Sequence, residues 1–217
     1  MPVLRLAPGL ALTALLCAWP AGAGYNDFES LDLLQIQLVG RDLYAIDADG
    51  STLLERLETG EAVLWRRAIG RVGVVLTDRR MLAASTGSSR WQSERFLQSE
   101  RPHQQALLDE RVAILLTDKR VLSLDSVYGT LAIERFGPNE WVVATELAEA
   151  VAVVATNRRA LGTAPRLRGF VAKNLTPREV PLSISATGNL ATVLTARRLL
   201  TFRGNSGAWG ERRRKIH

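Results

Sequence analysis

The chain has 217 residues, of which 47% are hydrophobic and 6% aromatic, and its formal net charge at pH 7 is +6. This composition, without a long polar or low-complexity tract, excludes an intrinsically disordered chain and predicts a compact globular body. The basic balance favours an anionic partner such as polysaccharide, phosphorylated lipid or an acidic protein, and no nucleic acid.

Residues 1–23 are typical of a secretory signal peptide. One basic residue, Arg5, precedes the apolar stretch 10–18, and the small residues Ala21, Gly22 and Ala23 follow as a cleavage pattern. The apolar stretch is about half of the ~20 residues that a membrane-spanning helix needs. We therefore expect no transmembrane segment in the mature chain, with an uncleaved membrane anchor as the alternative.

The single cysteine, Cys17, lies inside this predicted leader. The bulky Leu16 before it argues against lipid modification, which uses a small residue at such a site. Without a cysteine the mature chain forms no internal disulfide, and a chain of this size does not require one in an oxidising compartment. These features predict a periplasmic or secreted protein.

An apolar run breaks at a short polar turn five times, and the breaks recur at a fixed period. The residues that follow the turns are spaced by 38, 40, 39 and 39 positions: Leu43, Met81, Val121, Ala160 and Leu199. A second column, spaced by 39, 40 and 39, marks where units begin: Glu61, Glu100, Glu140 and Glu179. Such a period predicts a repeat architecture. We expect one domain over 24–217, with units 24–60, 61–99, 100–139, 140–178 and 179–217.

Each unit is predicted to contain four short antiparallel strands. In the second unit the predicted strands are 62–69, 72–76, 81–85 and 91–97, and turn residues separate them. No mature segment shows sustained helical periodicity, so the class is all-β. The second strands are almost continuously apolar, and a strand that is apolar on both faces must be covered on both.

About 40 residues and four strands per unit resemble the blades of a β-propeller, as in WD-type repeats, although the Gly-His and Trp-Asp signatures of that family are absent. The resemblance implies a five-bladed β-propeller with four antiparallel strands per blade. We expect the ring to close by packing of the first blade on the last. An open solenoid, or a ring completed by another chain, is the alternative.

In four of the five units the turn between the second and third strands carries two basic residues. In a propeller these turns share one rim with the connections between blades, so the first basic residues would form a crown suited to phosphate, sulfate or carboxylate, including anionic polysaccharide: Arg79, Lys119, Arg158 and Arg197. The alternative is that they only form ion pairs with the Glu column of an adjacent blade.

The second basic residue of each turn is predicted to be structural. Arg80 and Glu94 lie at equal distances from the predicted turn between them, as do Arg120 and Glu134. Each pair is therefore expected to form an ion pair across a hairpin. The Thr-Asp-Arg-Arg string also resembles a strand-turn-strand signature of bacterial pleckstrin-like domains, but such a domain fills a much longer stretch than one repeat.

Aromatic residues form a second candidate site. One column of the outer strands holds Trp91, Leu131, Phe170 and Trp209, and the inner strands hold Trp65 and Trp141. Burial between blades is the main interpretation, because a large aromatic side chain gains most from burial. Exposed tryptophan would instead favour a carbohydrate-binding, lectin-like propeller.

Catalysis has little support in the sequence. The only histidines are His103 and His217, and we find no metal-ligand spacing, nucleotide-binding glycine loop or Gly-x-Ser-x-Gly string. Some five-bladed propellers are glycoside hydrolases, but here the carboxylates recur once per repeat, as structural residues do. We expect an exported, non-enzymatic binding or scaffolding module without catalytic residues, cofactor or metal. The alternative is a carbohydrate-binding or glycoside-active propeller.

Overall fold

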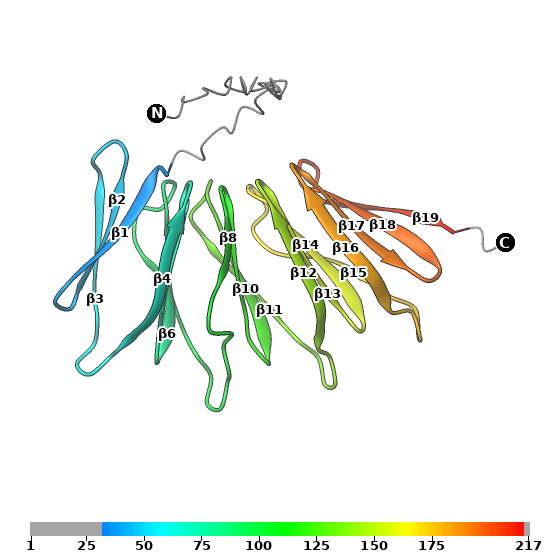
Figure 1. The fold of residues 1–217 in the computed structure, drawn as a ribbon, viewed down its shortest axis with the longest axis horizontal. Helices are drawn as coiled ribbons and strands as arrows, with labels where there is room; N and C mark the ends of the chain where they lie inside the picture. Colours follow the sequence, from blue (N-terminus) through cyan, green and yellow to red (C-terminus); the bar gives the residue numbers. More distant parts are fainter. Residues whose placement is uncertain (1–31, 215–217) are drawn as a thin grey trace, which may run out of the picture.

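A computed structural model describes residues 32–214, which consist of strands and connecting turns without a helix. No segment in that range is a helix that could cross a membrane. The predicted leader 1–23, Cys17 and His217 lie outside the described residues. The strands within 32–214 form five antiparallel sheets stacked face to face in a row (Figure 1).

The sheets follow one another along the chain, so each is one blade. The first blade contains β1 (Leu34–Val39), β2 (Asp42–Asp47) and β3 (Thr52–Arg56). The second contains β4 (Val63–Ile69), β5 (Val72–Thr77), β6 (Arg80–Ser85) and β7 (Gln92–Arg95). The third contains β8 (Leu107–Asp109), β9 (Val112–Leu116), β10 (Arg120–Asp125) and β11 (Leu131–Arg135). The fourth contains β12 (Val142–Ala148), β13 (Val151–Thr156), β14 (Arg159–Thr163) and β15 (Val171–Asn174). The fifth contains β16 (Pro181–Thr187), β17 (Leu190–Thr195), β18 (Arg198–Arg203) and β19 (Ala208–Arg213).

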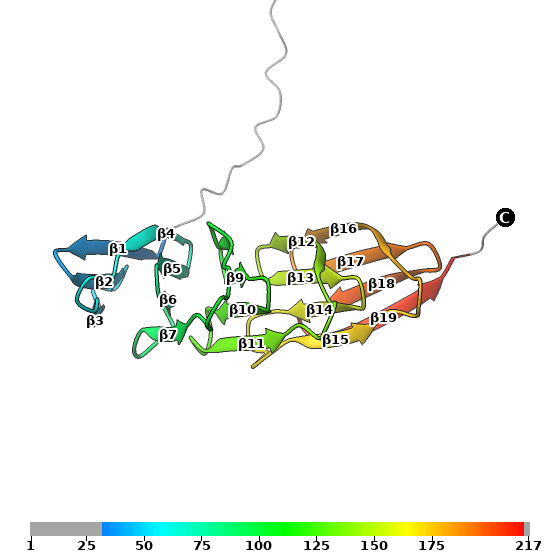
Figure 2. The same cartoon turned by 90° about the horizontal axis from the view of Figure 1, so that it is seen from below.

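Each blade is a meander of hydrogen-bonded neighbours in chain order. The innermost strands lie along one side of the row and the outermost along the other (Figure 2). The all-β class and the five propeller-type blades are confirmed. The first blade differs from the prediction, because it has three described strands: β1 corresponds to the second strand of the other blades, and the place of a first strand falls before residue 32.

The predicted closure of the ring is wrong for this structure. The first and last blades lie at opposite ends of the row, which is an open fan (Figure 1). Both end faces carry polar side chains where other blades are packed. Gln35 and Gln37 are exposed at positions that are glycine, alanine or aliphatic in the other four blades, and Thr192 replaces a valine or isoleucine. A polar outer face is typical of terminal repeats and lowers the cost of leaving them uncovered.

Four hydrophobic clusters fill the four spaces between neighbouring blades. The central strands β5, β6, β9, β10 and β13 are buried along their whole length. This agrees with the expectation from their apolar sequences, since both faces of each strand contact a neighbouring blade. Burial between blades is therefore the main source of stability in the fan.

The closest approach of blades four and five requires glycine at position 162. A Cβ atom there would lie 2.6 Å from the ring of Phe202, which is fully buried. Gly162→Ala is expected to lower the free energy of unfolding by about 1–3 kcal/mol, because the ring must shift in a packed core. Denaturant unfolding measures this, with Gly169→Ala as the control, since its Cβ would meet nothing within 4 Å. Equal stability of the two variants would contradict the packing argument.

The two rims of the fan are built differently. The connection rim, at the lower edge of Figure 1, holds the basic turns and the connections between blades, 57–62, 96–106, 136–141 and 175–180. On the opposite, inner-turn rim, backbone N–H groups of each of the first four blades donate to a carbonyl of the next blade: Leu33 and Leu34 to Gly70, Arg71 to Glu110, Arg111 to Glu149, and Ala150 to Gly188. Because successive loops of a blade lie on alternate rims, the basic turns and the connections share one rim, as the repeat pattern predicted.

Candidate functional site

Each basic turn is shaped by the threonine before it. Thr117 Oγ1 accepts hydrogen bonds from the backbone N–H groups of Lys119 (3.0 Å) and Arg120 (2.9 Å), and donates to the Arg120 carbonyl (3.0 Å). The same three bonds recur at Thr77, Thr156 and Thr195. A hydroxyl that bonds its own local backbone favours a turn. In every turn the first basic residue is more exposed than the second.

The second basic residue joins its blade to the connection before it. Arg120 donates from Nε to Glu100 Oε1 (2.8 Å) and from Nη2 to Glu100 Oε2 (3.0 Å), a bidentate pair. It also donates to Glu94 (2.5 Å) and to the Arg95 carbonyl (2.6 Å) of the preceding blade. The Arg120 side chain is 2% exposed and that of Glu100 is 0% exposed. One guanidinium therefore fixes the relative position of two blades.

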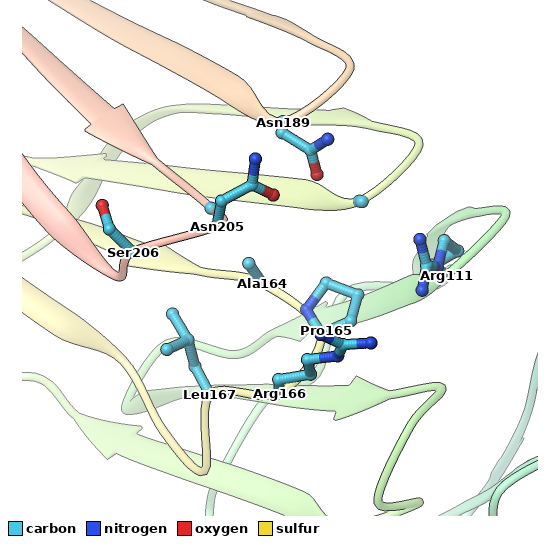
Figure 3. A pocket seen from close by; sticks show the side chains of 10 residues that line it. Arg111, Ala164, Pro165, Arg166, Leu167, Asn189, Asn205 and Ser206 are labelled. Carbon is cyan, nitrogen blue, oxygen red and sulfur yellow. The ribbon is translucent and has the colours of Figure 1, made fainter.

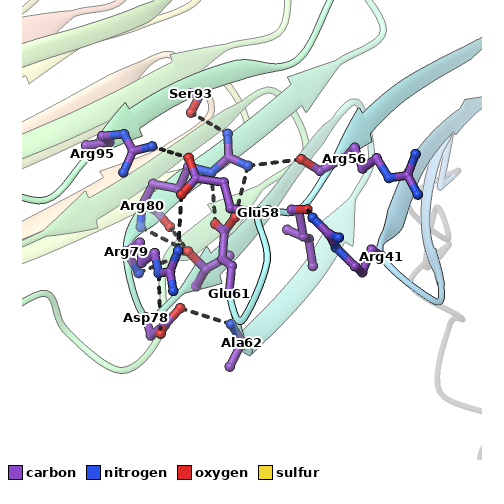
Figure 4. A network of polar contacts seen from close by, with 12 residues as sticks. Arg41, Arg56, Glu58, Glu61, Ala62, Asp78, Arg79, Arg80, Ser93 and Arg95 are labelled. Atoms are coloured by element: carbon purple, nitrogen blue, oxygen red, sulfur yellow. Dashed lines mark hydrogen bonds and ion pairs between the residues drawn. The ribbon is translucent and has the colours of Figure 1, made fainter.

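The same arrangement occurs at all four connections. Figure 4 shows it around Arg80, which contacts Glu61, Ser93 and the Arg56 carbonyl. Arg80 also donates to Glu55 of the preceding blade. We call the repeated pairs the Arg–Glu clamps: Arg80–Glu61, Arg120–Glu100, Arg159–Glu140 and Arg198–Glu179. In each clamp the glutamate also accepts the backbone N–H three residues before it, which closes the connecting turn.

The predicted pairing of the second basic residues is wrong. All four predicted residues form ion pairs, but with partners one blade away: Arg80 with Glu55, Arg120 with Glu94, and Arg159 with Glu134. The strand register explains this, because Arg80 pairs with Arg95 and Glu94 pairs with Met81. Successive side chains of a strand point to opposite faces. Glu94 therefore faces the next blade, whereas Arg80 faces the preceding one.

The clamp glutamates stay ionised in spite of burial. Burial alone would raise the pKa of Glu61, but hydrogen bonds from the Arg80 guanidinium and the Glu58 backbone N–H lower it to about 2. Burial acts in the same direction on Glu179, and Arg198 and the Thr176 backbone lower that pKa to about 2 as well. The hydrogen bonds between arginine and glutamate in these clamps are therefore charge-assisted at neutral pH.

The first basic residues are less committed to the fold. Of the four first basic residues, only Arg79 forms ion pairs within residues 32–214, with Glu58 (3.2 Å) and Asp78 (3.9 Å). Lys119 Nζ instead donates to the Gln98 carbonyl (2.8 Å). The alternative of structural pairing therefore applies to Arg79.

Arg158 and Arg197 are both exposed, and they reach different connections. The backbone of Arg158 contacts the connection 175–180, but its guanidinium lies at the preceding connection, with Nη1 3.6 Å from the position of a Cβ atom on Gly137. The Leu175 N–H donates to the Arg158 carbonyl (2.8 Å), and Arg197 Nη1 donates to Thr176 Oγ1 (3.4 Å). No carboxylate in the described part of the chain forms an ion pair with either guanidinium. The predicted crown is thus divided, with its unpaired arginines at the end formed by blades four and five.

Acidic residues disappear from the turns toward that end. The residue after the threonine is Asp78, Asp118, Asn157 and Ala196 in successive blades. The residue before each clamp glutamate has positive φ, and is Gly60, Ser99, Asn139 and Arg178. Arg178 therefore adds a third exposed cation to this end of the rim, on the connection that Arg197 also contacts. We call Arg158, Arg178 and Arg197 the basic rim cluster. Arg178 is not among the residues predicted from the sequence, although its column lies directly beside that of the clamp glutamates.

The aromatic prediction holds in part. Trp91 is 6% exposed, and its Nε1 donates to the Leu53 carbonyl of the preceding blade (3.2 Å). Trp209 makes the equivalent bond to the Val171 carbonyl (2.8 Å). Burial between blades is confirmed for Trp91, holds in part for Trp209, which is half-buried, and is wrong for Trp141, which is 59% exposed at the start of blade four.

A hollow of about 370 Å³ lies on the inner-turn rim near blades three to five (Figure 3). Arg111 and Arg166 line it together with the polar residues Asn189, Asn205 and Ser206, and none of its ten lining residues is acidic. The buried Nε of Arg111 has no hydrogen-bond partner among the described residues. This hollow is chemically suited to a small anion, and the sequence analysis did not identify it.

No family model matches the sequence, and no curated protein matches it. Similar solved structures include human WBSCR16 (TM-score 0.39, 11% identity, covering 74% of this chain and 56% of that chain). Others are yeast RCC1 (Prp20) bound to Kap60 (0.40, 10%, covering 79% and 54%) and the WD40 domain of SCAP from fission yeast (0.35, 8%, covering 85% and 56%). The chain thus spans about half the length of these structures. By its own topology of five stacked antiparallel meanders, it is a repeat protein of the β-propeller type.

Proposed function

We propose that this protein is an exported, non-enzymatic binding module that holds an anionic ligand or an acidic partner protein at the basic rim cluster. One observation carries the proposal: Arg158, Arg178 and Arg197 are exposed and form no ion pair within residues 32–214, whereas the adjacent Arg159 and Arg198 are used by clamps. In each of these two turns an arginine without an ion pair thus precedes an arginine that is held in a clamp.

The chemistry of the cluster favours oxyanions. A guanidinium is always charged and presents a planar fork of donors that matches phosphate, sulfate or carboxylate. Arg178 also holds a left-handed backbone conformation (φ 67), at a position that is glycine, serine or asparagine elsewhere. The turn imposes this conformation at all four connections, and an arginine adopts it at a cost in backbone strain that glycine would not have.

Export is part of the proposal and rests on the predicted leader and the absence of cysteine from residues 24–217. A basic exported protein meets acidic envelope polymers and acidic proteins, which fits a scaffolding role. Membrane anchoring by an uncleaved leader would leave the rim chemistry unchanged.

The test replaces all three arginines of the cluster by glutamine. We expect this variant to elute from a sulfated or phosphorylated matrix at clearly lower salt, because three charge-assisted contacts are lost. Its stability should change little, since exposed substitutions away from structural contacts usually alter unfolding by about 0.5 kcal/mol or less. The matched control replaces the exposed Arg66, Arg90 and Arg203, which removes the same charge elsewhere.

Identical elution of the two triple variants would show that only net charge matters and would overturn the proposal. Arg178→Gly provides a further check, because glycine adopts positive φ without strain. We expect this variant to bind less tightly and to be at least as stable as the parent. Reduced stability would instead assign Arg178 to the fold.

Carbohydrate binding is a second candidate function, favoured by the exposure of Trp141. Its neighbours at the start of the inner strands, Val143, Val180 and Leu182, are also exposed. An exposed apolar patch next to an indole is suited to stacking against a sugar ring. Retention on a neutral polysaccharide that is lost in Trp141→Ala would support this function over the anionic one.

A further inference from the structure

The two ends of the fan expose the two halves of one repeated interface. At every internal junction, the trailing face of a blade packs against the leading face of the next blade. The leading face of blade one, with Gln35, Gln37 and Tyr44, has no blade before it among the described residues. The trailing face of blade five, with Thr192 and Leu199, has none after it. The internal junctions therefore show what each free face is built to contact.

The charges of the internal junctions follow a simple rule. The trailing face supplies a glutamate from its outermost strand, and the leading face supplies the clamp arginine: Glu55 with Arg80, Glu94 with Arg120, and Glu134 with Arg159. The register between the third and fourth strands fixes the place of these glutamates. Each one lies opposite the residue that follows the basic turn or its equivalent: Glu55 opposite Leu43, Glu94 opposite Met81, and Glu134 opposite Val121. The equivalent positions on the two free faces therefore follow from the same register.

At the free faces both charges are reversed. The trailing column ends in Arg212, which pairs with Leu199 in the register, and the leading column begins with Asp42. A reversal on one face alone would make that junction repulsive, but reversal on both restores the attraction. Asp42 has one partner in its own blade, the exposed Arg56 at 3.4 Å, a contact of the weak surface kind.

The junction of blades four and five shows that such reversals are compensated across an interface. There the trailing column holds Lys173 in place of glutamate, and Glu211 on blade five pairs with it at 3.0 Å. Glu211 also accepts a hydrogen bond from Arg198 (2.7 Å). A basic residue in the trailing column is thus matched by a carboxylate on the next leading face, which is the role that Asp42 would have toward Arg212.

Shape agrees with charge at the free faces. The trailing face of blade five contains a hollow of about 410 Å³ lined by Leu194, Leu199 and residues 212–214. Tyr44, half-buried on the leading face of blade one, occupies the column whose other members are completely buried against a preceding blade: Leu82, Leu122, Leu161 and Leu200. The phenol ring is the side chain placed to enter that hollow, and its hydroxyl would reach the arginines at its edge.

We propose that the trailing face of one copy docks on the leading face of a second copy, head to tail. Docking within one chain is not available, because the two faces lie at opposite ends of the fan (Figure 1). Such an interface is heterologous, so it propagates to rings or short linear assemblies. Because Gln35, Gln37 and Thr192 make the faces partly polar, the association is reversible and concentration-dependent.

Sedimentation velocity over a range of protein concentrations tests the proposal. The parent protein should pass from monomer to larger species as concentration rises. Asp42→Arg and Arg212→Glu should each weaken association about tenfold, since each places like charges opposite one another. Arg135→Glu, an exposed reversal outside both faces, is the control and should associate like the parent.

Mixing the two weakened variants tests whether position 42 of one copy faces position 212 of another. In the mixture, the altered leading face of the Asp42→Arg variant meets the altered trailing face of the Arg212→Glu variant, so opposite charges again face each other. The unaltered faces of the two variants keep the native pair. Association should return to the parental level. A parent that stays monomeric, variants that associate like the parent, or a mixture without recovery would each overturn the proposal. None of these outcomes depends on anion binding at the basic rim cluster.

Discussion

Arg120→Ala is expected to lower the free energy of unfolding by about 3–5 kcal/mol, because it leaves the buried Glu100 carboxylate without its counter-ion. Glu100 is completely buried and receives two hydrogen bonds from that guanidinium. The same substitution removes the contacts to Glu94 and to the Arg95 carbonyl, which join blades two and three. Denaturant unfolding followed by tryptophan fluorescence measures the loss.

Two further variants identify the cause. Lys119→Ala alters the adjacent residue of the same turn, which forms no ion pair within the described chain, and should change stability by about 0.5 kcal/mol or less. Arg120→Met combined with Glu100→Met should recover much of the loss, since replacement of a whole buried pair by apolar residues is often neutral. If Arg120→Ala is as stable as Lys119→Ala, the clamp does not hold the blades together.

The repeat explains which parts of the fold are predictable from the sequence. Residues such as Met81 and Val121 recur because each packs in the same place between blades, so the period predicts blade number and strand order. Closure does not follow from the period, since it depends on the rotation between successive blades and on the end faces. Gln35 and Gln37 were the available sign of an uncovered end face, because they stand in two columns whose other members are small or aliphatic and buried.

The site was predictable in its position and less so in its chemistry. Alternation of loops correctly predicts that Arg79, Lys119, Arg158 and Arg197 share a rim with the connections. Which of them is paired depends on the connection that each side chain reaches, Glu58 for Arg79 but Thr176 for Arg197. The hairpin pairing failed for a geometric reason: a one-residue difference in register moves a side chain to the other face of the sheet.

Acid is expected to destabilise the fan through the clamp glutamates. The pKa values of Glu61 and Glu179 fall from the ordinary 4.5 to about 2 in the folded state. A carboxylate with a lowered folded pKa contributes stability that is fully present above pH 4.5 and is lost as pH falls toward 2. The unfolding midpoint should therefore fall steeply between pH 4.5 and 2.

Glu179→Gln separates this effect from general acid denaturation. The amide does not titrate, so this variant should be less stable than the parent at pH 7 and should lose less stability on acidification. The difference between the two proteins should narrow as pH approaches 2, where the parental carboxylate becomes protonated. Glu149→Gln, at an exposed position outside the clamps, is the control and should follow the parental curve. Parallel curves for Glu179→Gln and the parent would mean that proton uptake on unfolding occurs elsewhere, and the clamps would then not be the acid-sensitive joints between blades.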